Sequence, residues 1–285
     1  SANIIHSNGK FYLLVGTSTS NRDHFYIVDA KTLYYENSAV VGANLSGLTI
    51  LNEQYGLVTG DGIRRIDLKS LNNVRIKNER LLCFYNSIIY NGKVLSNDTY
   101  KDESKVKYYD VNELIAAKEG EAPAVTELDI IQKQKINFVL AKDGNVYTLE
   151  SADNGCNIVK IKNDFTLEKV FANFQPAKGP YHSSPTIGMV ASETENIIYL
   201  VSTDGAIYKY ILGDSDSLKA PFIAAESGVS ITAPLQLNQQ SGELYVTYTE
   251  ERKDESKIVV YSKDGKVLHT VDCGESVPSQ ILFNN

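Results

Sequence analysis

The chain has 285 residues, of which 42% are hydrophobic and 22% charged, a composition that is ordinary for a globular protein with a large core. Its net charge of −7 argues against a protein that tracks nucleic-acid phosphates, because such proteins usually present a basic face. No apolar run approaches the roughly 20 residues of a membrane-spanning helix, and the three cysteines, which are far apart and form no CxxC pair, argue against a disulfide framework or a zinc site.

A unit of about 40–50 residues recurs along the chain, and such a period is typical of repeat architectures. Each unit has a turn pair, an apolar strand, a polar loop and a second apolar strand. The six stretches are 8–33, 52–71, 90–114, 142–167, 194–212 and 241–268. Four of them end in DAKTL, DLKSL, DVNEL and NDFTL, which share an Asp or Asn a few residues before a Leu.

Further apolar strands flank these stretches and bring each unit to four strands, named here A, B, C and D. Expected A strands are 3–7, 47–51, 86–90, 136–141, 184–191 and 233–238. Expected D strands include 34–40, 125–130, 167–172 and 266–271. Val, Ile, Tyr, Thr and Phe fill them, as expected of strands. A short helix is expected only at 112–118 (NELIAAK), between strands C and D of the third unit.

The pattern predicts an all-β fold, a β-propeller of four-stranded blades formed by one domain over residues 1–285. Strands such as FYLLV and IIYLV are continuous apolar runs, which indicates burial on both faces, and a propeller blade is buried in that way. Asn-Gly, Asp-Gly and Ser-Gly pairs lie where tight hairpins need positive φ. We expect six blades. A seventh A-type strand, PSQILF at 278–283, leaves a seven-bladed ring with an incomplete closing blade as the alternative.

Two stretches, at 8–33 and 257–283, resemble the surface-layer-type propeller lipoproteins of Bacteroidetes. These belong to a wider propeller superfamily that includes the quinoprotein amine dehydrogenase heavy chain. The resemblance implies a seven-bladed propeller at the cell surface or in the periplasm. It also implies capture of a corrinoid and delivery to an outer-membrane transporter. No ligand-binding motif matches residue by residue, so the resemblance assigns no site.

Motifs for catalysis are missing from the sequence. GxSxG, HExxH, GxGxxG and GxxxxGK do not occur, and the four histidines are isolated in sequence. The absence of tryptophan disfavours a docked quinone cofactor and excludes a WD-type repeat signature. Asp214-Ser215-Asp216 lacks the remaining ligands of a calcium loop. We therefore expect no enzyme, no cofactor and no metal.

A ligand is expected on the face that carries the B–C and D–A loops, because function on rigid scaffolds concentrates in loops. The B–C loops are predicted at 16–24, 96–105, 151–156 and 247–256, and the long D–A loop 173–184 is stiffened by two prolines. The alternative interpretation is an ordinary Pro-Gly loop and solvated charges. The candidate ligand-binding residues are Arg22, His24, Tyr100, Tyr181, His182, Tyr248 and Arg252.

Three functions are compatible with this pattern. The first is capture of a small nutrient-type ligand, such as a corrinoid-like molecule or a glycan, at the mouth of the propeller channel. The second is a protein-interaction platform that docks an outer-membrane transporter or another surface protein. The third is a lyase or hydrolase that uses loop His and Asp residues. We expect the first, in a monomer that does not bind nucleic acid.

Overall fold

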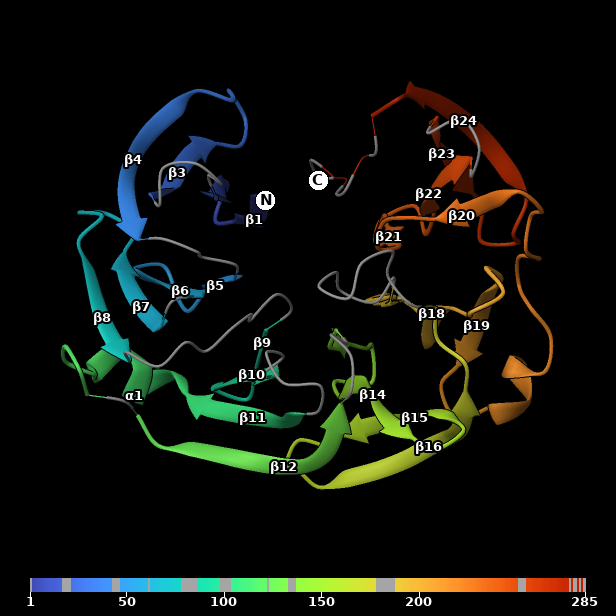
Figure 1. The fold of residues 1–285 in the computed structure, drawn as a ribbon, viewed down its shortest axis with the longest axis horizontal. Helices are drawn as coiled ribbons and strands as arrows, with labels where there is room; N and C mark the ends of the chain where they lie inside the picture. Colours follow the sequence, from blue (N-terminus) through green and yellow to red (C-terminus); the bar gives the residue numbers. More distant parts are fainter. Residues whose placement is uncertain are drawn as a thin grey trace. The chain divides into compact units, whose positions relative to one another are not determined.

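The computed structural model describes most of the chain. The described residues are 2–16, 22–42, 47–60, 62–77, 87–97, 104–121, 123–132, 137–177, 188–250, 255–276, 278, 281 and 283. They fold into two compact units, Ser1–Lys133 and Gln134–Asn285, and each contains three antiparallel sheets (Figure 1). The six sheets are the blades of a β-propeller, so the predicted all-β fold and the blade count of six are confirmed. One domain over residues 1–285 stays a prediction.

Unit 1, Ser1–Lys133, contains blades 1 to 3. Blade 1 consists of β1 (Ala2–Ser7), β2 (Lys10–Val15), β3 (Asp23–Asp29) and β4 (Tyr35–Gly42). Blade 2 consists of β5 (Gly47–Ile50), β6 (Tyr55–Gly60), β7 (Gly62–Asp67) and β8 (Asn73–Lys77). Blade 3 consists of β9 (Ile88–Tyr90), β10 (Lys93–Asn97), β11 (Ser104–Asp110) and β12 (Val125–Gln132). The helix expected at 112–118 is α1 (Val111–Ala116), between β11 and β12.

Unit 2, Gln134–Asn285, contains blades 4 to 6. Blade 4 consists of β13 (Val139–Leu140), β14 (Val146–Ala152), β15 (Gly155–Ile161) and β16 (Leu167–Phe174). Blade 5 consists of β17 (Met189–Ala191), β18 (Ile197–Val201) and β19 (Ile207–Ile211), followed by the 3₁₀ helix η1 (Ser215–Leu218). Blade 6 consists of β20 (Val229–Ile231), β21 (Gln236–Leu237), β22 (Leu244–Glu250), β23 (Ser256–Tyr261) and β24 (Val267–Gly274).

Blades 5 and 6 depart in detail from four regular strands. In blade 5 a single bridge, Ile207 to Ile223, stands in place of a full D strand. Nearby Pro221 has no N–H to donate to such a ladder. In blade 6 the A position is shared by β20 and β21, which both pair with β22. Of the stretch 278–283, the described residues are Pro278, Ile281 and Phe283, and none of these lies in a strand.

The Asn-Gly pairs form the hairpins that the sequence predicts. Asn8 and Gly9 have φ of 51° and 71°, and Asn91 and Gly92 have φ of 47° and 70°. Positive φ at both central residues is the signature of a type I′ turn, whose twist matches that of the flanking strands. These turns fix the register of β1 with β2 and of β9 with β10.

The shared Asp…Leu endings form a recurring C–D turn. Asp29 accepts hydrogen bonds from the backbone N–H groups of Lys31 and Thr32 at 3.1 and 2.7 Å. Asp67 does the same one blade later. The leucine that closes each turn, Leu33 or Leu71, has a left-handed φ of 59° or 60°. In blade 3 the same position, Asp110, caps the N-terminus of α1.

These turn aspartates should make stability depend on acid. Hydrogen bonds from Thr32 lower the pKa of Asp29, and those from Ser70 lead the causes that lower the pKa of Asp67, below the ordinary 3.8. A lowered folded pKa contributes stability above about pH 4, and this contribution is lost as the pH falls through the folded value. The melting temperature of D29N/D67N should therefore fall less steeply than that of the parent between about pH 4 and pH 2. Parallel curves would contradict this role, because asparagine keeps the acceptor oxygen but does not titrate.

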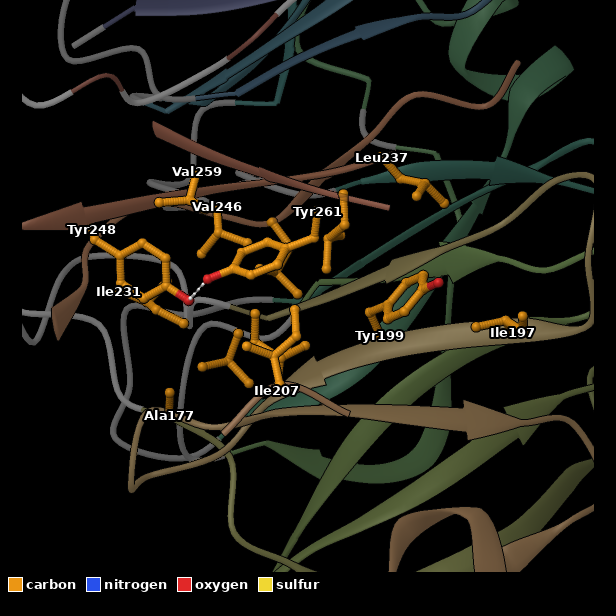
Figure 2. Packing of buried hydrophobic residues seen from close by; sticks show 14 residues of the cluster. Ala177, Ile197, Tyr199, Ile207, Ile231, Leu237, Val246, Tyr248, Val259 and Tyr261 are labelled. Atoms are coloured by element: carbon orange, nitrogen blue, oxygen red, sulfur yellow. Dashed lines mark hydrogen bonds between the residues drawn. The ribbon is translucent and has the colours of Figure 1, made fainter. Parts of the chain in front are cut away.

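Buried apolar clusters join neighbouring blades within each unit. In unit 1, one cluster includes Phe25 of β3 and Ile66 of β7, and another includes Leu57 of β6 and Val94 of β10. In unit 2, the clusters join blade 4 to blade 5 and blade 5 to blade 6, the latter drawn in Figure 2. Stacking of one blade on the next thus explains the continuous apolar runs in the sequence.

Leucines that follow the C–D turns contribute to these clusters. Leu71 packs with blade 1, Leu114 packs with blade 2 and Leu218 packs with blade 4. In blades 2 and 3 the Asp…Leu ending is therefore both a turn and an anchor to the preceding blade, whereas Leu33 and Leu167, the leucines of the endings in blades 1 and 4, are exposed. Leu114 lies on α1, and Arg65 of β7 donates to the backbone carbonyl of Ala117 at 3.0 Å. This contact binds the end of the helix to blade 2.

Candidate ligand-binding face

The antiparallel order of the strands gives every blade two distinct ends. The A–B and C–D turns lie at one end, which we call the AB end. The B–C and D–A connections lie at the other, which we call the BC end. Most of the described polar side chains that are buried stand at or near the BC end. They include Asp23, Thr59, Ser96, Asn97, Gln132, Asn157, Ser202 and Ser256.

In blade 3 an amide pair marks the BC end. Asn97 is the last residue of β10 and Gln132 is the last residue of β12, and they are 6% and 1% exposed. The Asn97 side-chain N–H donates to Gln132 Oε1 at 2.6 Å. A side-chain amide carries both donor and acceptor positions, so this pair places both kinds of group at the BC end of blade 3.

Charged groups lie at the interface between blades 1 and 2. Asp23, only 1% exposed, is the Cα partner of Gly42. The Arg64 guanidinium packs against Gly42, because a Cβ there would lie 3.0 Å from Arg64 Nε. Arg64 Nη1 also donates to Asn73 Oδ1 at 3.1 Å. Gly42 has a φ of 149°, so a larger residue at this position would strain the backbone in addition to crowding Arg64.

In unit 2 the BC end of blade 6 carries a row of hydroxyls. The Thr249 hydroxyl bonds to that of Thr232 at 2.8 Å and to that of Ser256 at 3.0 Å. In blade 4, the Asn157 side-chain N–H donates to Glu150 Oε2 at 2.8 Å. Such side chains offer both donors and acceptors to a polar molecule.

Asn137 ties blade 4 to blade 5 near the same end. Its side-chain N–H donates to the Met189 carbonyl at 2.6 Å, and its Oδ1 accepts from the Met189 N–H at 3.2 Å. The side-chain amide thus replaces one step of a strand ladder. Gly188 is required beside it, because a Cβ there would lie 2.3 Å from Asn137 Oδ1.

The AB end has a different character. Its described turns are short, and few of the described buried polar side chains lie there. Surface charges are paired at this end, for example Lys10 with Glu36 at 2.7 Å, as they also are at the BC end, where Lys257 pairs with Glu226 at 3.2 Å. Asp143 accepts from Lys160 at 2.8 Å and from the Tyr147 hydroxyl at 2.9 Å. Burial alone would raise the pKa of Asp143, but hydrogen bonds from Lys160, Asn145 and Tyr147 lower it below its ordinary value. These polar side chains at the AB end therefore form hydrogen bonds and ion pairs with one another.

Two of the predicted site residues lie at the BC end of blade 1. Arg22 is exposed directly before β3. His24 is half-buried as the second residue of β3, and its ring stacks on Tyr26 with centroids 5.8 Å apart. Tyr26 in turn meets Tyr35 of β4 edge-on at 6.4 Å. A ligand role for Arg22 and His24 stays a prediction.

Tyr248 lies in the core. It is 3% exposed in β22, and its hydroxyl bonds to that of Tyr261 at 3.0 Å within the cluster between blades 5 and 6 (Figure 2). In this arrangement its ring supports the blade and offers no surface to a ligand. The alternation of Leu244, Val246 and Tyr248 along β22 is the sequence signal that places Tyr248 on the buried face.

Four predicted site residues lie outside the described residues: Tyr100, Tyr181, His182 and Arg252. The described start of the loop 173–184 pairs with the end of β18. The Ala177 N–H donates to the Val201 carbonyl at 2.8 Å, and the Thr203 N–H donates to the Gln175 carbonyl at 2.9 Å. Binding by this loop stays a prediction.

The buried polar residues of the BC end were not predicted from the sequence. Asn97 was assigned to a loop, yet it closes β10 opposite Val106. The available signal was a polar residue at the end of an apolar strand in several units. In the described part of the chain, no group of three or more His, Cys, Asp and Glu side chains is arranged to hold a metal ion. No helix among the described residues is long and apolar enough to span a bilayer.

Comparison with known proteins supports the fold. A family model described as "Domain of unknown function (DUF5074)" matches residues 1–284. No curated protein matches the chain. A similar solved structure is the β-propeller domain of Cps50 (Swd1) from Myceliophteria thermophila, with 13% identity, a TM-score of 0.59, and coverage of 98% of this chain and 91% of that chain.

Two further structures have the same TM-score of 0.59 and 11% identity. One is a functionally unknown protein from Desulfotomaculum acetoxidans, with coverage of 98% of this chain and 87% of that chain. The other is a prolyl endopeptidase, with coverage of 97% of this chain. The present chain spans 43% of that enzyme's chain. At such identities the likeness concerns the fold alone.

Proposed function

Because the chain belongs to the family described as a domain of unknown function (DUF5074), we propose its function from its own geometry. It is a non-enzymatic binding module that takes a small polar ligand at the BC end of its blades. The observation that carries this proposal is the burial of polar side chains at or near that end, whereas the described AB end carries short turns and few such side chains.

Burial of polar side chains is costly for a fold that stacks apolar blades. Taking a polar group out of water costs free energy that its hydrogen bonds within the fold only roughly offset, whereas an apolar side chain of the same shape avoids that cost. Asp23, Asn97 and Gln132 are nevertheless buried at strand ends. A ligand that uses such groups supplies a reason for their presence, because binding sites combine apolar walls with a few placed polar groups.

The proposal also draws on the resemblance to surface propeller lipoproteins, which favours a position outside the cytoplasm and a corrinoid or glycan as ligand. Limited proteolysis of intact producing cells, and of the same cells after their outer membrane is permeabilised, tests the location, since a cytoplasmic protein would be spared in both. Docking of a transporter and lyase or hydrolase chemistry stay predictions. Among the described residues we find no observation that favours either over ligand capture.

A thermal-shift screen with cyanocobalamin, haemin and maltoheptaose tests the function. At least one probe should raise the melting temperature, because a ligand at 100 times its Kd stabilises by about 2.7 kcal/mol. The binding of that probe is then measured by calorimetry for two variants. Arg22→Ala removes an exposed cation at the BC end of β3, and Lys31→Ala removes one beyond its AB end.

Arg22→Ala should weaken binding roughly tenfold, which corresponds to about 1.4 kcal/mol. Lys31→Ala should leave binding unchanged, which makes it the matched control for the loss of one positive charge. Weaker binding in Lys31→Ala alone would place the ligand at the wrong end of the blade. A screen in which no probe shifts the melting temperature would count against capture of these ligand classes.

A further inference from the structure

One buried hydroxyl at the BC end has an unfilled hydrogen-bonding capacity. Thr59, the second-last residue of β6, is 1% exposed. Its Oγ1 atom is buried and has no hydrogen-bond partner among the described residues. The residue opposite Thr59 on β5 is Gly47, which has no side chain that could supply one. An unpartnered buried hydroxyl in a native protein commonly marks the position of a bound water or ligand atom.

Three other hydroxyls belong to the same interface between blades 2 and 3. Side chains alternate along a strand, so Thr59 shares the face of Leu57, and Ser96 of β10 shares the face of Val94. Leu57 and Val94 are packed in one cluster between blades 2 and 3. The Thr49 and Ser87 hydroxyls, one from each blade, hydrogen-bond directly across the same interface.

The side chains that carry these four hydroxyls are largely shielded from solvent. Thr49, Thr59 and Ser96 are 6%, 1% and 3% exposed, and Ser87 is half-buried at the start of blade 3. None of the four carries a charge. Each hydroxyl both donates and accepts, and this suits a partner that also does both. A carboxylate or phosphate can only accept, and a charged group is costly to bury without an opposite charge.

We propose that Thr49, Thr59, Ser87 and Ser96 form a binding site for one neutral hydroxyl, supplied either by a buried water or by a saccharide. The two sources share the same chemistry at the site. The saccharide source rests on the proposed function, whereas the water source stands without it. A water with two to four polar partners is also a typical element of protein interiors.

Thr59→Val tests the site, because valine keeps the shape of threonine and removes the hydroxyl. Thr59→Ser retains the hydroxyl and serves as the conservative variant. Thr126→Val, at an exposed position of β12, is the control for the same substitution on a strand surface. The melting temperature of each protein is measured with and without maltoheptaose, and the wild type is also measured with cyanocobalamin and haemin.

A bound water predicts that Thr59→Val melts about 2–4 °C below the wild type, while Thr126→Val does not. A bound saccharide predicts that maltoheptaose stabilises the wild type and Thr59→Ser but no longer Thr59→Val. If none of the three probes stabilises the wild type but Thr59→Val melts lower, the water site stands and the proposed function fails.

Two results would overturn the site. One is a Thr59→Val protein that melts at or above the wild-type temperature with an unchanged response to maltoheptaose, as expected when an empty, unsatisfied hydroxyl is removed. If Thr59→Val does not fold, the site is tested in the wild type instead, by NMR magnetisation transfer from water to the Thr59 amide. A long-lived water signal there supports the site. Its absence, together with no stabilisation by maltoheptaose, overturns it.

Discussion

Replacement of Leu114 by alanine should lower the free energy of unfolding by about 2–5 kcal/mol, the range for a large buried aliphatic side chain. Leu114 is fully buried and packs in the cluster that joins blade 2 to blade 3. It lies on α1, whose end is bound by Arg65, so the helix cannot shift freely to fill the cavity. Relaxation should therefore recover little of the lost packing.

Urea unfolding followed by far-ultraviolet circular dichroism and tyrosine fluorescence measures this effect, since the chain has 18 tyrosines and no tryptophan. Val125→Ala is the control, because Val125 begins β12 and is 42% exposed. It should change stability by about 0.5 kcal/mol or less. A Leu114→Ala protein as stable as this control would mean that the anchor to the preceding blade contributes nothing.

Removal of one hydroxyl from the Tyr248–Tyr261 pair should lower stability by about 1–3 kcal/mol, because the remaining hydroxyl is left buried and unbonded. The two oxygens are 3.0 Å apart within the cluster between blades 5 and 6 (Figure 2). Burial and the bond to Tyr261 raise the pKa of Tyr248, in keeping with a neutral hydroxyl in an apolar setting.

A double-mutant cycle of Tyr248→Phe and Tyr261→Phe separates the pair from simple loss of polarity. The double variant should be less destabilised than the sum of the single variants, because neither partner is then left unsatisfied. Tyr199→Phe is the control in the same cluster, since Tyr199 takes no part in the bond between Tyr248 and Tyr261. Strictly additive losses in the cycle would refute a direct interaction.

Local sequence signals predicted much of the fold. Asn8-Gly9 and Asn91-Gly92 specify type I′ turns through their φ requirement, and the Asp…Leu endings specify C–D turns through side-chain hydrogen bonds. Both signals act over a few residues, so they can be recognised without tertiary context. The near absence of a D strand in blade 5 was harder to predict, because the bridge from Ile207 to Ile223 joins residues that are far apart in sequence.

The candidate site was harder to predict, because its members meet only after the blades stack. Asn97 and Gln132 are 35 residues apart in sequence and bond across the ends of two strands. Thr49 and Ser87 belong to different blades. Tyr248 shows the opposite error in interpretation, since a tyrosine near a polar loop looked available for binding although strand alternation buries it.

Hydrogen–deuterium exchange with the most stabilising probe tests the central claim most directly. Exchange at the BC end should slow in peptides that cover 16–24, 96–105, 173–184 and 247–256, or the BC-end residues next to them. Exchange at the AB end, in peptides that cover 8–9, 91–92, 142–145 and 262–266, should be unchanged. Slower exchange confined to the AB-end turns would contradict a ligand-binding face at the BC end.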